Sequence, residues 1–451
     1  MSPKPANSLT EGSIWKGLLF FAIPIMLSNL LQQMYNTIDS AVVGTWAGSE
    51  ALAAVGSTSA LINLLVGFFL GISTGAGVVY ATYFGAKDEK NLRRVIDNSL
   101  ILGAAAGIIL TATGVIFCPQ LLRLMNTPEE VMDLAVTYLR IYFGGIIVML
   151  IYNIGAGLIR AGGDSRRPLY YLIISGFLNL VMDVLFVAVL GLGVAGAAWA
   201  TVISQACSAV LVTVHMMRFP KGYRLTLRGI RFDKETSAQI VKLALPCGIQ
   251  SSMFNIANLL VQVKINGFGS VAMAGVAAYT KIDGFVYTPT QAISLAVSTY
   301  VGQNIGAGNI DRAKKGVNRA VVLVLCTSIT IGGTVLLLGE HLLHLFTSDE
   351  VVVDFGLQMM YVMASTAWTF SPADVLSGAM RGAGAATQVT IINALCICLF
   401  RILFLTFVLP LYMNISFLFM VYPMSWLLCT VCIVIYYRKG KWMKNAVLVS
   451  K

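Results

Sequence analysis

The sequence is poor in charged residues. Only 11% of its 451 residues are Asp, Glu, Lys or Arg, whereas 57% are hydrophobic. A soluble globular domain carries about 25% charged residues, so this composition excludes an ordinary soluble fold. A helix that crosses a bilayer needs roughly 20 apolar residues, and the chain offers about twelve runs of that length. The composition therefore predicts an all-α integral membrane protein with twelve transmembrane helices.

Residues and motifs for catalysis are also scarce. The chain has three histidines, and none has the neighbours expected of a general base. It contains neither a P-loop for ATP nor the nucleophile elbow of hydrolases. A G-x-G-x-x-G match at 191–196 lacks the strand and the acidic residue of a dinucleotide site, so we interpret it as a tight outer turn. These absences argue against an enzyme and against a cofactor, and they leave ion gradients as the energy source.

Metal and disulfide chemistry have little support either. Several of the eight cysteines lie in apolar runs, where a thiol behaves as a small hydrophobic group. Cys429 and Cys432 form a C-x-x-C pair, but no second pair of ligands accompanies them. His341 and His344 alone are too few to hold a metal ion. We therefore expect neither a structural metal nor a redox site.

Basic residues are in excess, with a formal net charge of +11, and their distribution is uneven. They gather in alternate loops, at 87–94, 160–167, 218–234, 312–319 and 438–444. The loops between these clusters contain few cations, with Arg123 as the main exception. This positive-inside pattern predicts a bacterial-type inner (plasma) membrane protein with both termini in the cytoplasm. The cations thus report orientation in the lipid bilayer, and we do not expect nucleic acid as a partner.

The sequence contains two copies of one pattern of residues. A constant offset aligns the copies and matches position 48 with position 269. Matching segments are 48–55 with 269–276, 85–86 with 306–307, and 157–160 with 378–381. An even number of helices in each copy makes the repeats parallel, and substrate sites in such folds lie between the halves. We therefore predict an N-terminal lobe of six helices at 1–217, a basic cytoplasmic linker at 218–237, and a C-terminal lobe of six helices with a basic tail at 238–451.

Polar residues recur along two of the apolar runs, one in each copy. Asn29, Gln33, Asn36 and Ser40 form one stripe at helical spacing, and Ser251, Asn255, Asn258 and Gln262 form another. Pro24 and Pro246 precede the two stripes at matching positions, and this alignment needs an offset one residue longer than elsewhere. Facing stripes of this kind would line a water-filled cavity. We assign to the substrate cavity the polar, acidic and aromatic residues Gln33, Tyr35, Asn36, Asn255, Asn258, Asp283, Tyr287 and Asp374.

Two acids of the first copy carry the strongest functional signal. Asp39 and Asp183 lie inside apolar runs, where charged groups are costly, and Asn179 lies on the same helical face as Asp183. Such a carboxyl group can take up and release a proton, or it can coordinate a sodium ion. The alternative is a structural acid that is hydrogen-bonded between helices. The repeat places Leu260 and Phe404 opposite these acids, so we predict that the ion site was not duplicated.

Several isolated basic residues in the second copy have a simpler interpretation. Snorkelling toward an interface explains Lys264 and Arg401 as well as any functional role does. Lys281 lies too close in sequence to Asp283 for a good ion pair on one helix, so we expect its partner on another helix.

The chain resembles the multidrug and toxic compound extrusion (MATE) family over its whole length. The segments that carry the resemblance are 24–44 with Asp39, Arg160–Asp164 with Pro168, Asn179–Asp183, Gly191–Thr201 and Met380–Gly384. The resemblance implies two six-helix lobes around a central cavity that opens alternately inward and outward. In the DNA-damage-inducible-type branch, the coupling site matches Asp39, Asn153, Asn179, Asp183 and Thr201. Sodium, if it is the coupling ion, would bind at Asp39, Asn179 and Asp183.

Another branch of that family uses a glutamate in helix 7 with an aspartate in helix 10. This chain has Asn255 in the first stretch, although Asp374 is present in the second. We therefore expect the ion site in the N-terminal lobe alone.

These observations predict a monomeric, secondary active multidrug antiporter. It would export cationic, amphipathic small molecules in exchange for H+ or Na+ by alternating access. A flippase for lipid-linked precursors is the alternative, but such proteins hold diphosphates with several cations, whereas acids dominate here. A membrane-embedded enzyme is disfavoured because no catalytic cluster is present.

Overall fold

The computed structural model describes residues 9–125, 127–219, 224–226, 229–412, 414–440 and 442–443, and these form helices and turns without any strand. Ten of the helices are long and apolar enough to cross a membrane. The pair α4 (Glu129–Gly144) and α5 (Ile146–Ala161), bent by 49°, makes an eleventh span. Helix α9 (Ser270–Gly306) has 37 residues, enough for a twelfth, although Lys281 and Asp283 make it more polar. The predicted all-α membrane fold is confirmed.

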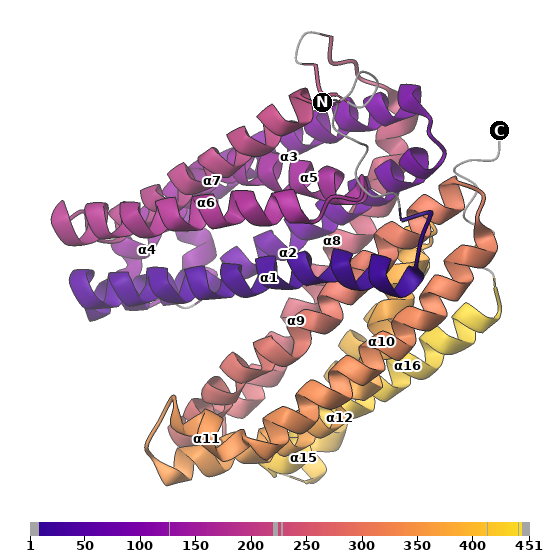
Figure 1. Cartoon of the computed structure of the whole chain (residues 1–451). Coiled ribbons are helices and arrows are strands. Elements are labelled where there is room, and N and C mark those ends of the chain that lie inside the picture. The colour runs from indigo at the N-terminus through magenta and orange to yellow at the C-terminus, as the bar shows by residue number, and fades with distance from the viewer. Residues whose placement is uncertain are drawn as a thin grey trace. The chain divides into compact units, whose positions relative to one another are not determined.

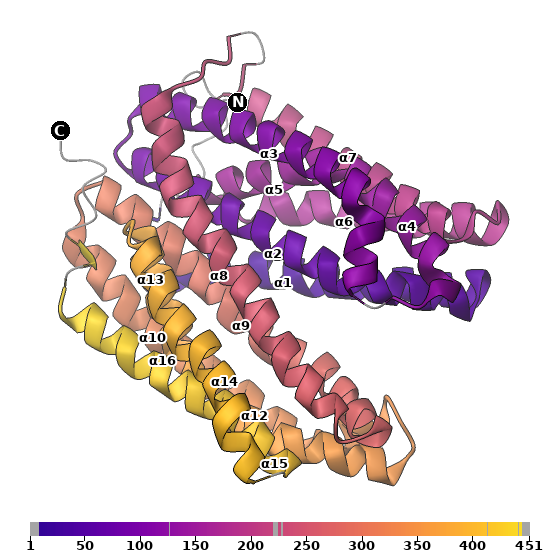
Figure 2. The ribbon, with the colours of Figure 1, turned by 180° about the vertical axis from the view of Figure 1, so that it is seen from behind.

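The remaining helices follow in chain order (Figure 1). The first half contains α1 (Ile14–Val42), the π-helix η1 (Val43–Ala47), α2 (Ser49–Gly85), α3 (Glu89–Leu124), α6 (Arg166–Asp183), the π-helix η2 (Val184–Val189) and α7 (Gly193–Met217). The second half contains α8 (Lys234–Asn266), α10 (Ile310–Leu337), α11 (Gly339–His344), α12 (Glu350–Gly382), α13 (Ala386–Asn393), η3 (Ala394–Leu399), α14 (Phe400–Leu403), η4 (Phe404–Val408), η5 (Leu409–Leu411), α15 (Ile415–Phe419) and α16 (Val421–Arg438). Figure 2 shows the span from α13 to α14 running beside α16.

The chain divides into two compact units. The first unit runs from Leu27 to Ala244, and the second contains residues 9–26 and the chain from Leu245 onward. Helix α1 therefore changes unit close to Pro24, and α8 changes unit close to Pro246. A proline inside a helix removes one backbone hydrogen bond.

The lobe boundaries at 217 and 238 stay predictions, and residues 220–223, 227–228, 441 and 444–451 of the linker and tail lie outside the described residues.

The same close helix contact occurs once in each unit. In the first unit, Ser73 Oγ of α2 donates to the carbonyl of Asn153 in α5 at 2.6 Å, beside Gly157. In the second unit, Ser294 Oγ of α9 donates to the carbonyl of Asp374 in α12 at 2.8 Å, beside Gly378. Small residues let membrane helices approach closely enough for such contacts. The constant offset of the repeat matches each position of the first contact to its counterpart in the second, so the sequence repeat is also a repeat of packing.

The glycine-rich match at 191–196 lies where η2 ends and α7 begins. Gly191 and Gly193 have φ angles of +64° and +55°, in the left-handed region that other residues rarely adopt. The segment is therefore a tight turn between two helices, as the sequence predicts, and not a phosphate-binding loop.

Asp233 caps the first turn of α8, just before the helix starts. Its Oδ2 accepts a hydrogen bond from the Thr236 amide at 2.9 Å, and Arg94 Nη1 lies 4.0 Å from its Oδ1. The hydrogen bonds from the Thr236 hydroxyl and amide hold the pKa of Asp233 below its ordinary value. The ionised carboxylate thus stabilises the folded state at neutral pH. This contribution is lost as the pH falls below 3.8 toward the lower pKa of the folded state.

We expect Asp233→Ala to lower the stability by about 1 kcal/mol at pH 7, because it removes this cap. The difference from the unchanged protein should shrink near pH 3, where the carboxyl group becomes protonated. Thermal unfolding of both proteins in micelles at the two pH values measures the effect. Glu235→Ala is the control, because Glu235 is an exposed acid on the same helical turn. An equal loss of stability in both variants would contradict the capping role.

Candidate functional site

Two carboxyl groups meet inside the first unit. Asp39 of α1 is 7% exposed and Asp183, the last residue of α6, is 0% exposed. Their side chains lie within hydrogen-bonding reach of each other. Apart from this contact, Asp39 Oδ1 and both carboxyl oxygens of Asp183 have no hydrogen-bond partner among the described residues. A buried carboxylate without a donor or a cation is costly, so a proton or a metal cation bound at the pair would lower its energy.

The local backbone places Asp183 at a change of helix type. Helix α6 ends at Asp183 and continues directly as the π-helix η2, in which the Leu190 amide donates to the Leu185 carbonyl at 2.9 Å. π-Helical segments are rare and occur frequently at functional sites, because the wider turn alters the directions of nearby side chains. Asn179 lies one turn earlier, is 2% exposed, and its Nδ2 has no partner among the described residues.

Hydroxyl groups surround the acid pair. The Tyr35 and Ser204 hydroxyl oxygens lie 3.2 Å apart, and Thr201 is within hydrogen-bonding reach of Tyr35. Tyr138 of α4 is 4% exposed and lies close enough to interact electrostatically with both acids. Carboxylate, amide and hydroxyl oxygens are the ligands that hard cations take. The cluster can therefore hold either a proton shared by the carboxyl groups or a small cation.

Four of the five predicted ion-coupling residues thus lie in or beside one cluster: Asp39, Asn179, Asp183 and Thr201. Asn153 makes its contacts elsewhere. Its Nδ2 donates to the Met149 carbonyl at 2.8 Å, and its own carbonyl accepts from Ser73. Within the described part of the chain, no hydrogen bond joins Asn153 to the acid pair.

The residues predicted to line a substrate cavity occupy varied positions within their own units. Gln33 and Asn36 are exposed on α1, whereas Tyr35 takes part in the acid cluster. In the second unit, Asn258 and Tyr287 are exposed and Asn255 is half-buried. Their joint role in a cavity stays a prediction.

Asp283 and Asp374 of the second unit differ from the Asp39–Asp183 pair because each has a partner, although Asp374 Oδ2 has none among the described residues. The Tyr279 hydroxyl donates to Asp283 Oδ1 at 3.0 Å. Arg381 Nη2 lies 3.8 Å from Asp374 Oδ1 and donates to Ser294 Oγ at 3.1 Å. The charge of Asp374 is therefore balanced by a neighbouring guanidinium group, whereas no basic side chain forms an ion pair with Asp39 or Asp183 in the described ranges.

The basic residues of the second unit differ in exposure. Lys264 and Lys281 are exposed, and no ion pair of Lys281 occurs among the residues that the structure describes, so the expected partner on another helix is not found. Arg401 is only 3% exposed, so the snorkelling interpretation is wrong for this residue. Its Nη1 donates to Asn258 Oδ1 at 2.7 Å, and its guanidinium lies 4.5 Å from the centre of the Tyr422 ring. These contacts satisfy the buried cation without an acid.

Sequence reasoning missed Tyr138 and Ser204. A signal for Ser204 exists, since Thr201, Ser204 and Ser208 recur at spacings of three and four residues along α7. Tyr138 has no such signal, because a single tyrosine in an amphipathic helix is an ordinary core residue.

Comparisons with known proteins agree with one another. The family model described as MatE matches residues 24–185 and again 246–407. The chain is 31% identical over 448 residues to the probable multidrug resistance protein YpnP of Bacillus subtilis (strain 168), covering 99% of this chain and 100% of that protein. It is 30% identical over 405 residues to the probable multidrug resistance protein YoeA of the same organism, covering 87% of this chain and 86% of that protein.

Two solved structures share the fold. A crystal structure of MATE in the bent conformation has a TM-score of 0.90 at 20% identity and covers 99% of this chain and 100% of that one. A MOP superfamily transporter from Pyrococcus furiosus, described with a binding pocket of reverse polarity that suggests a different function, has a TM-score of 0.89 at 22% identity, with both chains covered completely.

Proposed function

Because the chain belongs to the MatE family of multi-pass membrane transporters, we propose that it is a secondary active multidrug antiporter. It exports cationic, amphipathic small molecules in exchange for H+ or Na+. Transport proceeds by alternating access, with the ion site in the N-terminal lobe. The protein acts as a monomer in the plasma membrane, with both termini in the cytoplasm.

The observation that supports ion coupling most directly is the buried, unpartnered Asp39–Asp183 pair. Three of its carboxyl oxygens have no donor among the described residues, and no basic side chain balances the charge there. An incoming proton or sodium ion therefore changes the energy of this site by far more than it changes the energy of an exposed carboxylate. The membrane potential can drive such an ion across the bilayer, since one charge that crosses 100 mV is worth about 2.3 kcal/mol.

The surrounding oxygens fit either ion. A proton would be shared between the two carboxyl groups. A sodium ion would be held by carboxylate oxygens with Asn179 and the hydroxyl groups of Thr201 and Tyr35 as further candidate ligands. The two cases differ in the gradient that drives transport.

The test is efflux of ethidium, a cationic and amphipathic dye, from vesicles that contain the purified protein. A proton gradient is imposed first, and then a sodium gradient at constant pH. We expect one of the two gradients to drive dye movement well above that of protein-free vesicles. If neither gradient drives efflux, the antiport proposal is wrong. If cells that express the protein retain dye unchanged but alter their lipid-linked intermediates, the flippase alternative holds instead.

A further inference from the structure

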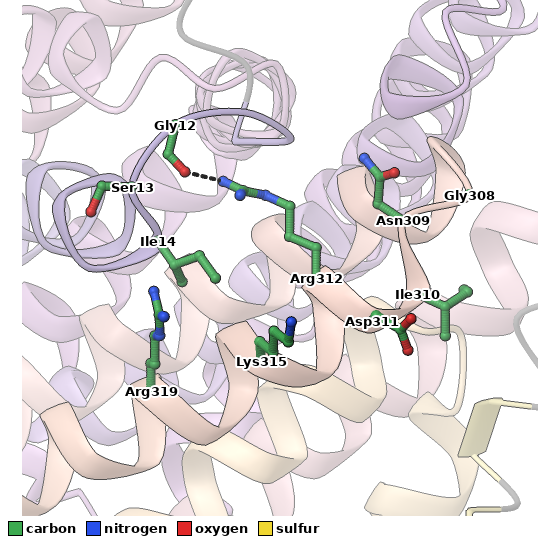
Figure 3. Close-up of a pocket in the computed structure, with 10 residues that line it drawn as sticks. All are labelled: Gly12, Ser13, Ile14, Gly308, Asn309, Ile310, Asp311, Arg312, Lys315 and Arg319. Atoms are coloured by element: carbon green, nitrogen blue, oxygen red, sulfur yellow. Dashed lines mark hydrogen bonds between the residues drawn. The ribbon is translucent and has the colours of Figure 1, made fainter.

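A basic pocket lies at the starts of α1 and α10, within the second unit. Its volume is about 590 Å³, within the range of ligand-binding pockets, and it is lined by residues 12–14 and by residues 308–312, 315 and 319. Figure 3 shows Arg312, Lys315 and Arg319 projecting from one side of α10 toward Gly12–Ile14. We infer that this pocket binds the phosphate-bearing headgroup of an anionic phospholipid.

The charge of the pocket is largely unbalanced. Arg312 donates to the carbonyls of Glu11 and Gly12 at 2.8 and 2.9 Å, and its Nε has no partner among the described residues. No ion pair joins Lys315 or Arg319 to an acid in the described part of the chain. Among the described residues that line the pocket, Asp311 is the only acid, so these residues carry a net charge of +2. Three cations on one face of a helix repel each other unless an anion lies between them.

The sequence repeat supplies an internal comparison. Its constant offset aligns Lys315 with Arg94 and Arg319 with Asn98, and the offset one residue longer that aligns α1 with α8 places Glu11 opposite Asp233. In the first unit, the carboxylate of Asp233 lies 4.0 Å from Arg94, and the Asp233 amide donates to Asn98 Oδ1 at 2.8 Å. In the second unit, arginine replaces that asparagine, and no ion pair joins Lys315 to Glu11 in the described part of the chain. The second unit therefore lacks the ion pair that the first unit has at this place, and Arg319 adds a cation there.

The position of the pocket favours a lipid over free phosphate. Ile14 and Ile310 are the first residues of two membrane-crossing helices, so the pocket lies at the depth of lipid headgroups. Trp15 and Leu19, which follow Ile14 on α1, are 40% and 44% exposed. A half-exposed tryptophan at a helix end is typical of the membrane interface. The positive-inside pattern predicts that this end faces the cytoplasm, where basic pockets between helices bind anionic headgroups.

The test uses the full-length protein in detergent micelles, titrated with phosphatidylglycerol. Native mass spectrometry counts bound lipid, and thermal unfolding gives an independent affinity. Each cation near a headgroup is worth about 1 kcal/mol, which is about fivefold in affinity. We therefore expect Lys315→Gln to bind about fivefold more weakly and the double variant with Arg319→Gln to bind about thirtyfold more weakly.

Lys314→Gln is the matched control, because Lys314 is an exposed neighbour that does not line the pocket, and its affinity should stay unchanged. Ser13→Asp provides a second variant that adds an acid to the pocket and suits a helix N-terminus, so it should fold and still lose lipid affinity. If Lys314→Gln weakens binding as much as Lys315→Gln, or if Ser13→Asp leaves it unchanged, the pocket is not the site. If inorganic phosphate binds as tightly as phosphatidylglycerol, the assignment to lipid is wrong.

Discussion

Asp183→Asn is expected to reduce ion-driven ethidium efflux to the level of protein-free vesicles. The amide has nearly the shape of the carboxyl group, but it cannot take up a proton or balance the charge of a sodium ion. Asp183 is fully buried, and outside the acid pair neither of its oxygens has a hydrogen-bond partner among the described residues. Asp39→Asn should have the same effect, since the two carboxyl groups form one site. Efflux under each imposed gradient measures both.

The stability of the same variant separates a coupling role from a structural one. If Asp183 were a structural acid, its loss would leave buried donors without a partner and lower the unfolding temperature. If the acid pair has no donors, the unfolding temperature of Asp183→Asn should stay unchanged or rise, because removal of an unbalanced buried charge is neutral or stabilising. Asp133→Asn is the control for general effects, since Asp133 is exposed on α4 of the same unit. Efflux that survives in Asp183→Asn, or a fall in its unfolding temperature, would contradict the proposal.

The sequence predicted those features of the fold that depend only on the apolar character of the membrane interior. Long apolar runs predicted the spanning helices, the repeat predicted two lobes, and the MATE-like architecture of two six-helix lobes is confirmed. The paired contacts at Ser73 and Ser294 follow the same offset, although the sequence did not predict them. Hydropathy cannot indicate which unit each half of a helix packs against. The change of unit in α1 beside Pro24 was therefore not predicted. The π-helices η1 to η4 were also missed, because one extra residue per turn hardly alters an apolar pattern.

The candidate site was predictable in part. The energetic cost of an acid in a membrane helix identified Asp39 and Asp183, and the i, i+4 spacing added Asn179. Thr201 came from the family resemblance alone. Arg401 was misjudged because exposure depends on neighbouring helices, and sequence spacing does not reveal that Tyr422 and Asn258 enclose it. Tyr138 approaches the site from a fourth helix, α4, and such a tertiary arrangement has no periodic signal.

Gly378→Ala is expected to destabilise the second unit by about 1–3 kcal/mol, the usual cost of overpacking a tight contact. A Cβ atom on Gly378 would lie 2.4 Å from the Ser294 backbone oxygen, and a backbone atom cannot rotate away. Helices α9 and α12 must therefore separate, which also weakens the hydrogen bond of Ser294 to the Asp374 carbonyl. Thermal unfolding in micelles measures the loss.

Two further glycines test whether the clash itself is the cause. At Gly157, the corresponding position of the first unit, an added Cβ would meet the Ser73 hydroxyl at 2.2 Å. That side chain can rotate, at the expense of its hydrogen bond to Asn153, so Gly157→Ala should cost less than Gly378→Ala. A Cβ on Gly333 of α10 would meet no atom within 4 Å, so Gly333→Ala should be neutral or slightly stabilising. The expected order, from the largest loss of stability to the smallest, is Gly378→Ala, Gly157→Ala and Gly333→Ala. Equal effects at Gly378 and Gly333 would show that close helix packing does not hold the second unit together.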